Sequence, residues 1–305
     1  MDIKHLTYLL EIVKQLNFTK AAESLHLTQP TLSKMVRSLE DELGVTLFDR
    51  SGKYIKLTDA GIAAVQQIQV IVQAVQDLHT SLNDVSNLRT GSIRIGLPPV
   101  IGTIFFPHVV AAFQKAYPQI DFQIIEEGAK KVESRILEGN LDLGVVVAPV
   151  DTDEFEIMPY LEEELALILH ESHPLAANPS VPLLELRREP FILFPNGFAV
   201  RKHIMQACST VGFEPRVTYE SAHWDLLAEM VAANTGISIL PQAICCKINN
   251  PSVKTVRLTN PTIPWNLIII WNKAKYQSYA MREFKRFITY SAKPSRTIPD
   301  SSSLI

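Results

Sequence analysis

The sequence predicts three consecutive parts: an N-terminal all-α winged helix-turn-helix domain, a long dimerisation helix and a C-terminal α/β domain. Residues 1–58 hold short helical patterns that end in a basic, hairpin-like stretch, and residues 59–89 form one helical pattern without proline. From residue 90 to about residue 290, short β-rich runs alternate with helical segments, which is typical of an α/β fold. The polar tail, residues 291–305, is expected to be disordered.

Composition places the chain among soluble globular proteins. Of its 305 residues, 47% are hydrophobic and 20% are charged. No apolar run is long enough to span a membrane, and Glu11 interrupts the N-terminal apolar stretch, so we expect neither a membrane contact nor a signal peptide. Three cysteines suit a reducing cytoplasm better than a disulfide framework. Because the net charge is −3, any nucleic-acid binding must come from a local patch.

The first domain contains a helix, a short break and a second helix. Asn17 can cap a helix that packs through the small residues Ala21 and Ala22. After the break, Thr28 can cap the next helix, and Pro30 lies in its first turn, where a missing N–H costs nothing. This spacing predicts a helix-turn-helix, whose second helix places its N-terminal side chains against base edges.

The second helix of this motif carries polar side chains on its first turn. Glutamine can pair with adenine, and serine and threonine can contact either partner of a base pair. A plain helical hairpin with a solvated polar face is the alternative interpretation. The predicted reading residues are Gln29, Pro30, Thr31, Ser33 and Lys34.

A basic turn and a short strand follow, and they predict a wing. Residues 1–60 contain eight Lys or Arg and eight Asp or Glu, so simple electrostatic attraction is weak. The distribution is more informative, because the basic residues fall where a recognition helix and wing face DNA. They are Lys20, Lys34, Arg37, Arg50, Lys53 and Lys56.

The long helix carries apolar residues at alternating spacings of four and three. Such a heptad seam predicts pairing of two chains, and a two-fold protein suits a two-fold DNA site. The alternative is a helix that packs only on its own domain. The seam residues, which follow Ala64, are Ile68, Ile71, Val75, Leu78, Leu82 and Val85.

The run "FTKAAESLHLTQPTLSKMVRSLEDELGVTLFDR" followed by "LTDAG" resembles the DNA-binding domain of LysR-type transcriptional regulators. The alanine pair, Gln-Pro, Leu-Gly and Leu-Phe-x-Arg all lie in family register. The resemblance extends over residues 1 to 290, and overall similarity is greatest to the CidR-like subgroup. It implies that the helix starting at Gln29 enters the major groove and that Arg37, Arg50 and Lys53 contact phosphates. It also implies a homodimer or homotetramer, promoter DNA as partner, and RNA polymerase as a further partner if the protein is an activator.

The same resemblance implies that the α/β part is a two-lobed effector domain built like a periplasmic binding protein. Lobe 1 is expected at residues 90–162 and 267–290, and lobe 2 at residues 163–266. We predict strands at 92–97, 121–126, 141–148, 164–170, 190–195, 217–221, 235–241 and 265–271. The first helix of lobe 1 is expected at 103–118, and the chain is expected to cross between lobes near 160–164 and 265–268.

A small ligand, anionic by preference, is expected in the cleft between the lobes, where strand ends meet helix N-termini. Arg201 can pair with a carboxylate, although it can equally be a surface charge. Pro98 and Pro99 remove two N–H donors, and Glu127 repels an anion unless it points outward. The predicted contacts are Pro99, Val100, Thr103, Gly128, Asn196, Phe198, Arg201, Ser221 and His223.

Other functional classes find little support in the sequence. We find no nucleotide-binding glycine motif, nucleophile elbow or metal-ligand spacing, so we predict no enzyme, no catalytic residues, no metal and no cofactor. His170 and His173 fit a solvated turn better than a ligand pair. A redox sensor using Cys208, Cys245 or Cys246 is the first alternative, against which these are small buried hydrophobic residues. An α/β small-molecule-binding protein without gene control is the second.

Overall fold

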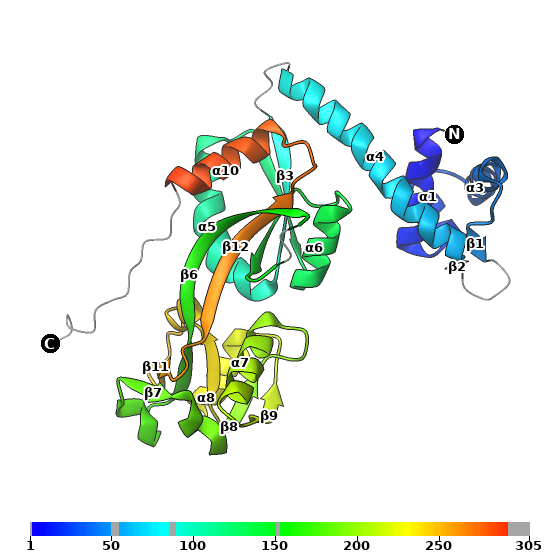
Figure 1. Cartoon of the computed structure of the whole chain (residues 1–305). Helices are drawn as coiled ribbons and strands as arrows, with labels where there is room; N and C mark the ends of the chain where they lie inside the picture. Colours follow the sequence, from blue (N-terminus) through cyan, green and yellow to red (C-terminus); the bar gives the residue numbers. More distant parts are fainter. Residues whose placement is uncertain (1, 50–54, 86–89, 151–152, 292–305) are drawn as a thin grey trace. The chain divides into compact units, whose positions relative to one another are not determined.

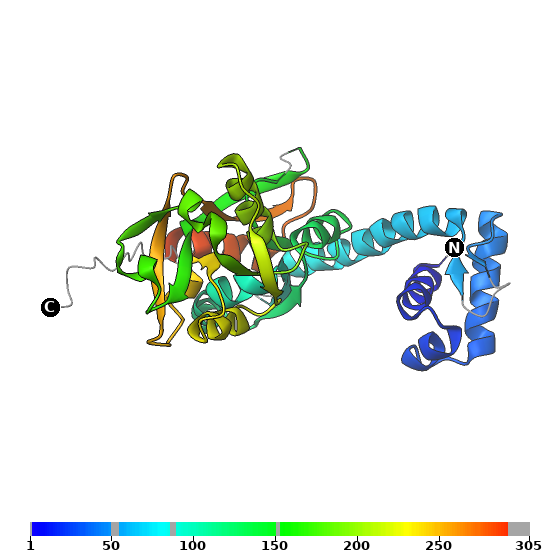
Figure 2. The same ribbon diagram turned by 90° about the horizontal axis from the view of Figure 1, so that it is seen from below.

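The computed structural model describes residues 2–49, 55–85, 90–150 and 153–291. The chain forms two compact units, of which the second begins at Thr90. The first contains α1 (Ile3–Gln15), α2 (Phe18–Ser24), α3 (Gln29–Leu43), β1 (Phe48–Asp49), β2 (Lys56–Leu57) and α4 (Asp59–Val85). In Figure 2 the three short helices gather around the first half of α4.

Polar side chains begin the short helices as their sequence predicts. The Asn17 side chain accepts backbone hydrogen bonds of 2.9 and 3.1 Å at the start of α2. Thr28 accepts one of 3.4 Å at the start of α3, and Asp2 caps α1. Gly44 ends α3 with a φ of 70°, a conformation that costs glycine little. The predicted caps at Asn17 and Thr28 are therefore confirmed.

One hydrophobic core holds the first unit together. Leu32, Val36 and Leu39 are the buried face of α3, and they share this core with Val65 and Ile68 of α4.

Close packing against the wing explains a glycine in α4. A Cβ on Gly61 would collide with the carbonyl oxygen of Leu47, just before β1. Only glycine therefore allows α4 to lie this close to the wing.

Lobe 1 of the second unit is a sheet covered on both faces (Figure 1). Its strands are β3 (Gly91–Leu97), β4 (Ile120–Glu126), β5 (Leu143–Val147), β12 (Pro264–Asn272) and the first part of β6 (Phe155–His170), in the order β4-β3-β5-β12-β6. The helices α5 (Pro99–Ala116) and α10 (Tyr279–Ser291) pack in one core cluster, and α6 (Ala129–Leu137) packs in another. Gly96 and Gly144 face Val132 of α6, which can approach because neither strand residue has a Cβ.

Lobe 2 is built around the second part of β6, which pairs antiparallel with β10 (Ser238–Pro241) and β11 (Val253–Thr259). β7 (Ser180–Pro182) lies parallel to β11. β8 (Pro190–Leu193) and β9 (Arg216–Glu220) form a separate parallel pair. The helices are α7 (Ala199–Thr210), α8 (Trp224–Ala232), α9 (Gln242–Cys245) and the short 3-10 turns η1 (Pro174–Ala177) and η2 (Leu183–Arg188).

The strand β6 is longer than predicted and passes through both lobes (Figure 1). Residues 155–164 pair with β12 in the sheet of lobe 1, whereas residues 165–170 pair with strands of lobe 2. The sequence predicted only the apolar part, residues 164–170, because the earlier residues alternate with glutamates. The predicted crossing near residues 160–164 lies within this strand. The strands β7 and β11 were not predicted.

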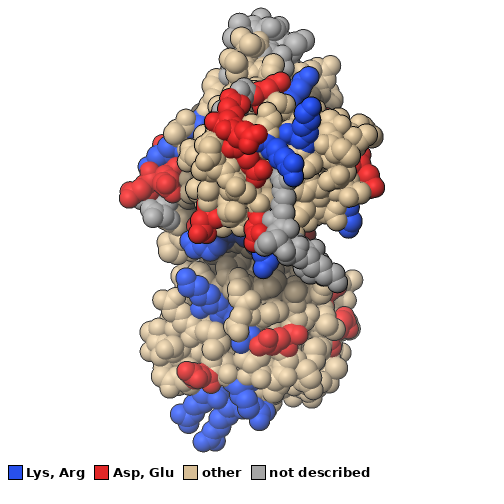
Figure 3. Space-filling model, turned by 90° about the vertical axis from the view of Figure 1, so that its right-hand side faces the viewer, with Lys and Arg blue, Asp and Glu red and all other residues tan. Residues whose placement is uncertain are grey.

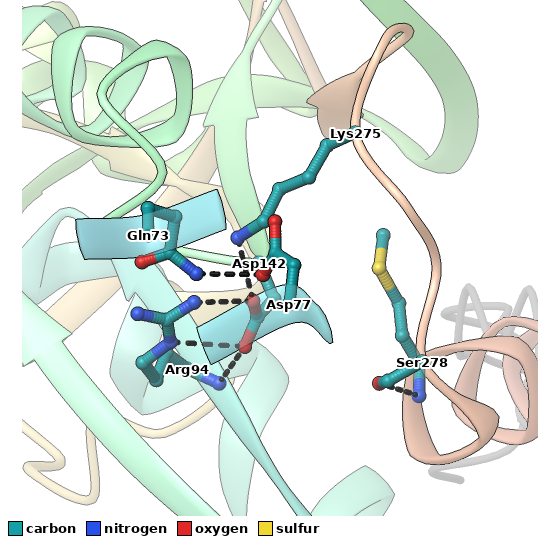
Figure 4. Close-up of polar contacts among 7 residues, drawn as sticks. Gln73, Asp77, Arg94, Asp142, Lys275 and Ser278 are labelled. Carbon is teal, nitrogen blue, oxygen red and sulfur yellow. Dashed lines mark hydrogen bonds and ion pairs between the residues drawn. The ribbon is translucent and has the colours of Figure 1, made fainter. Parts of the chain in front are cut away.

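A half-buried charge cluster fixes the start of lobe 1 (Figure 4). The carboxylate of Asp142, just before β5, accepts hydrogen bonds from the Arg94 guanidinium at 2.7 and 3.2 Å. It also accepts one from the backbone N–H of Arg94 at 2.8 Å. Lys275, after β12, donates to the same carboxylate at 3.0 Å. Burial opposes ionisation of Asp142, but Arg94 and Lys275 prevail and lower its pKa. In the first unit, Gln73 donates to Asp77 on the next turn of α4 at 2.7 Å.

Candidate nucleic-acid interface and ligand site

The first turn of α3 presents a polar, solvent-exposed edge. Gln29, Pro30, Thr31 and Lys34 are exposed, and Ser33 is half-buried. The opposite side of the same helix is buried in the domain core. This geometry leaves side chains that can form hydrogen bonds to bases free of the protein interior, at the helix end that a helix-turn-helix inserts into the major groove.

Side-chain contacts at the two ends of α3 fix the reading edge and the wing. The hydroxyls of Thr28 and Thr31 lie 2.8 Å apart, so Thr31 is oriented by the cap residue. Near the other end of α3, a carboxylate oxygen of Glu40 accepts from the N–H groups of Leu47 and Phe48 at 2.8 and 3.2 Å. Part of the acidic end of α3 therefore anchors the wing. The sequence did not reveal this role, because it depends on a partner seven residues away.

The predicted phosphate contacts divide between described and undescribed parts of the chain. Arg37 is exposed on α3, about one turn beyond Lys34. Arg50 and Lys53 lie outside the described residues, so the structure does not test their positions.

The apolar seam of α4 changes character along the helix. Ile68 is only 4% exposed and belongs to the core of its own domain, which corrects its assignment to a chain-pairing face. Farther along, Leu78 and Leu82 are each 57% exposed and Ile71 is 37% exposed. Val75 is half-buried, and the side chain of Val85 is not described. The second half of α4 therefore exposes apolar side chains.

The first predicted ligand loop is part of a helix. We expected a loop from Pro98 to Thr103, but α5 begins at Pro99, with Pro98 at its cap position. Proline fits this position because the first N–H groups of a helix have no intrahelical partner. Val100 is consequently a core residue of α5, 4% exposed, and not part of an open ligand loop as predicted. Thr103 lies inside α5, and its carbonyl oxygen accepts a hydrogen bond from the Lys247 ammonium in lobe 2.

Arg201 already has a partner. Its guanidinium donates to the Glu220 carboxylate at 2.6 Å and to the carbonyl of Phe194 at 2.9 Å. These two residues lie at the carboxyl ends of the parallel strands β8 and β9, where open α/β sheets bind ligands. The charge of Arg201 is therefore balanced by Glu220, and a ligand carboxylate must compete with it.

The neighbouring predicted contacts form two short loops. Gly197 has a φ of 95° in the turn after Asn196, and Phe198 stacks on Phe194 with 5.1 Å between ring centroids. Ser221 accepts from the backbone N–H of His223 at 3.1 Å, directly before α8.

Glu127 does not leave an uncompensated negative charge. Its carboxylate pairs with Arg135 of α6, with nitrogen–oxygen distances of 2.7 and 2.8 Å. Gly128, next to it, is exposed and directly precedes α6, where its carbonyl oxygen accepts from the N–H groups of Lys131 and Val132. The expected repulsion between Glu127 and an anion is therefore reduced by this ion pair.

The cap residues of α5, α7 and α8 make no side-chain capping hydrogen bond. The cap residues of these helices are Pro98, Phe198 and His223. In the first turn of α8, however, the Asp225 carboxylate accepts a hydrogen bond from the N–H of Leu226 at 3.0 Å. Free N–H groups at a helix start favour negative charge. Of the predicted contact residues of lobe 2, Asn196, Phe198 and Arg201 thus lie at the uncapped start of α7.

The cysteines and the two spaced histidines have separate local environments. Burial raises the pKa of Cys208 to about 12 and also raises the pKa of Cys245, whereas Cys246 is exposed. His170 contacts Ser172, and His173 lies 3.4 Å from Glu189. Among the described residues, no group of three or more His, Cys, Asp or Glu is arranged to hold a metal ion.

A groove of about 820 Å³ lies at the end of lobe 2, around η1 and η2. Lys and Arg side chains gather on this end of lobe 2 in Figure 3. The groove nevertheless has both signs of charge, with Arg187 and Arg188 beside Glu185 and Glu189. It therefore does not select a ligand by charge, and it lies outside the predicted ligand loops.

The described part of the chain contains no helix long and apolar enough to cross a membrane.

Comparisons with known proteins identify both units. Residues 3–62 match the family model described as bacterial regulatory helix-turn-helix protein, lysR family, and residues 86–293 match the LysR substrate binding domain. The regulator YwbI of Bacillus subtilis strain 168, itself uncharacterised, is 46% identical over 282 residues, which cover 92% of this chain and 94% of YwbI. The dual regulator OxyR of Escherichia coli K12 is 30% identical over 241 residues, or 79% of each chain.

Solved structures show the same architecture over nearly the whole chain. A full-length OxyR variant from Pseudomonas aeruginosa has a TM-score of 0.73 at 26% identity and covers 95% of this chain and 92% of its own. Full-length CbnR in complex with its target DNA has a TM-score of 0.71 at 21% identity, with coverage of 95% and 99%. The exposed turn of α3, the two-lobed second unit and these matches agree: the chain belongs to the LysR family of DNA-binding transcriptional regulators.

Proposed function

We propose that this regulator binds promoter DNA as a homodimer or homotetramer in the cytoplasm, and that a small anionic metabolite between the lobes controls it. The exposed polar edge of α3 supports base reading, since its opposite face is fully used by the domain core. The exposed apolar residues on the second half of α4 support pairing of two chains. Covering exposed leucine side chains with a partner removes apolar surface from water and so stabilises the pair. We propose a binding role without catalysis.

The ligand proposal rests on the loops of lobe 2. The N–H groups at the start of α7, which Phe198 does not cap, favour a negatively charged group, and Arg201 lies in the first turn of that helix. The Glu220 carboxylate lies 2.6 Å from the Arg201 guanidinium. We propose that the ligand's carboxylate exchanges with Glu220, so that ligand binding also releases the end of β9.

Peroxide sensing is the second candidate, because OxyR and proteins named hydrogen peroxide-inducible genes activator are among the relatives. A reactive cysteine needs thiolate character. The raised pKa values of Cys208 and Cys245 keep both thiols protonated near neutral pH. The environment of these two cysteines therefore favours metabolite control over thiol oxidation.

The test is a selection of genomic DNA fragments by the purified full-length chain. We expect the enriched fragments to lie upstream of genes and to share a two-fold symmetric element. Addition of short-chain carboxylates should change the affinity for such a fragment, whereas hydrogen peroxide should not. Enrichment without any shared symmetric element would contradict the dimeric promoter-binding proposal.

A further inference from the structure

A half-buried glutamate with one fully buried carboxyl oxygen lies where the chain crosses between the lobes. Glu163 belongs to β6 and pairs across the sheet with Trp265 of β12. One of its oxygens accepts from the backbone N–H of Ala243, in the first turn of α9, at 2.9 Å. Its other oxygen is buried and, among the described residues, has no hydrogen-bond partner; the same is true of the Trp265 indole nitrogen.

An ionised carboxylate is costly at this place. A buried charge needs several hydrogen bonds or an opposite charge, and Glu163 has one backbone donor. Burial therefore raises its pKa to about 7, and the hydrogen bond from Ala243 opposes that rise only in part. Near neutral pH, the neutral and the ionised form are both present.

The element held by Glu163 also connects the lobes. The helix α9 begins at Gln242 and is followed by Lys247, whose ammonium donates to the carbonyl of Thr103 in α5. The chain from Ala243 to Lys247 thus joins the crossing strand β6 in one direction and a helix of lobe 1 in the other. A change at the carboxyl group of Glu163 acts directly on this connection.

The groups around Glu163 do not compensate an ionised carboxylate. From α9, the buried Cys245 thiol faces it, and its pKa is raised mainly by burial and in part by Glu163 itself. From α7, the His203 ring contacts Trp265 edge-on at 5.7 Å, and burial lowers its pKa, so it is neutral when Glu163 ionises. Lys247 is engaged by Thr103.

Its neighbours along β6 are also committed elsewhere. Successive strand residues point to opposite faces, so Glu162 and Glu164 project away from Glu163. Glu164 pairs with Arg257 of β11 at 3.4 Å.

We propose that Glu163 is a protonation-controlled latch: in its neutral form it keeps α9 packed on β6 and Lys247 at α5, and in its ionised form it admits water and loosens α9. The latch requires no ligand and no DNA, so it is independent of the proposed effector. It makes the connection between the lobes sensitive to pH in the neutral range.

The sign of the effect follows from linkage. The folded chain keeps a proton on Glu163 between the ordinary pKa of 4.5 and the raised value of about 7, whereas the unfolded chain has lost it. This contribution to stability is therefore complete at low pH and is lost as the pH rises through about 7. Glu163→Gln imitates the neutral form and should remove the dependence.

Amide hydrogen exchange of the full-length chain tests the latch at α9. The peptide spanning residues 242–247 has the same sequence in the wild type and in Glu163→Gln, so intrinsic exchange rates cancel at each pH. At pH 5.5 we expect equal exchange. At pH 8 we expect the wild type to exchange at least about threefold faster, because opening of α9 is favoured when the carboxylate is ionised. Glu164→Gln, on the other face of the same strand, should behave as the wild type.

Equal exchange of the wild type and Glu163→Gln at pH 8 would overturn the latch, as would a difference that is the same at both pH values. If Glu163→Gln does not fold, Glu163→Leu replaces it, since leucine fills similar space without a titrating group. The measurement uses neither DNA nor carboxylate ligand. Failure of the promoter or metabolite proposal therefore leaves its result unchanged, and the reverse also holds.

Discussion

Gln29 is the side chain that best separates base reading from backbone contact. It is exposed on the first turn of α3 and lies beside the cap residue Thr28. If it forms hydrogen bonds with a base, Gln29→Ala should weaken operator binding by about 1–3 kcal/mol and change binding to random DNA little. Fluorescence anisotropy with both DNAs measures the two losses.

A matched control comes from the same residue type outside the reading edge. Gln66 is exposed on α4, so Gln66→Ala should leave both affinities unchanged. Equal losses on operator and random DNA for Gln29→Ala would show that Gln29 contacts the backbone and not a base.

The ion pair between Arg201 and Glu220 predicts opposite effects of two substitutions. Arg201→Ala removes a positive charge from the proposed ligand site and should reduce carboxylate affinity at least about tenfold, the effect of losing a charge-assisted hydrogen bond. Glu220→Gln removes the competing carboxylate and should increase the affinity. Isothermal titration calorimetry with short-chain carboxylates measures both. A carboxylate that binds both variants as it binds the wild type does not contact this guanidinium.

Residue roles were predictable from sequence where they depend on near neighbours. The caps Asn17 and Thr28 bond to N–H groups two or three residues away, so their pattern is visible in the sequence. Glu220 and Arg201 are nineteen residues apart, and Ala243 and Glu163 are eighty apart. Such pairs are formed by the fold, and a one-dimensional pattern does not specify them.

At the scale of elements, the second half of α4 predicts a chain-pairing surface. Leu78 and Leu82 are more than half exposed in the single chain. Truncation of a leucine in a packed interior costs about 2–5 kcal/mol, and a buried glutamate costs more. The double variant Leu78→Glu with Leu82→Glu should therefore dissociate into smaller assemblies and lose most operator binding. Multi-angle light scattering measures the mass.

The control for this variant adds the same charge to another part of the helix. Gln66 and Gln67 are exposed on α4, so their double substitution by Glu should keep the oligomer intact. An unchanged mass for the leucine double variant would place the interface elsewhere, on the second unit.

Element boundaries were predicted well where hydrophobic periodicity is strong and poorly where it is not. The strand β12 (Pro264–Asn272) is a nearly continuous apolar run, and its prediction at 265–271 is confirmed within one residue at each end. The strand β6 begins nine residues before its predicted start. Its first part pairs with β12 and has partly exposed positions, at which glutamates are tolerated. Similarly, Pro98 and Pro99 suggested a loop, but proline is equally compatible with the first turn of a helix.

At the scale of the whole molecule, the order of the parts was predictable because hydrophobic residues repeat with a different spacing in each part. The helical spacing of residues 1–89 and the strand–helix alternation after residue 90 correspond to the two compact units. The class of ligand was not predictable to the same degree. The contacts that we propose for it come from separate segments, and partners such as Arg135 and Glu220 change the net charge of the proposed site.

The two units should be thermodynamically coupled, and the coupling should be reciprocal. A ligand shifts DNA binding only through its different affinities for the two arrangements of the protein, typically about 1–3 kcal/mol. If a carboxylate changes operator affinity by a given factor, operator DNA must change carboxylate affinity by the same factor. Calorimetric titration of the carboxylate into the free protein and into the protein–operator complex measures this factor directly.

The leucine double variant supplies the control, since loss of the dimer should abolish the effect of DNA and leave carboxylate binding intact. Equal carboxylate affinities with and without operator, in a protein whose DNA binding responds to that carboxylate, would mean that the response arises from an additional site.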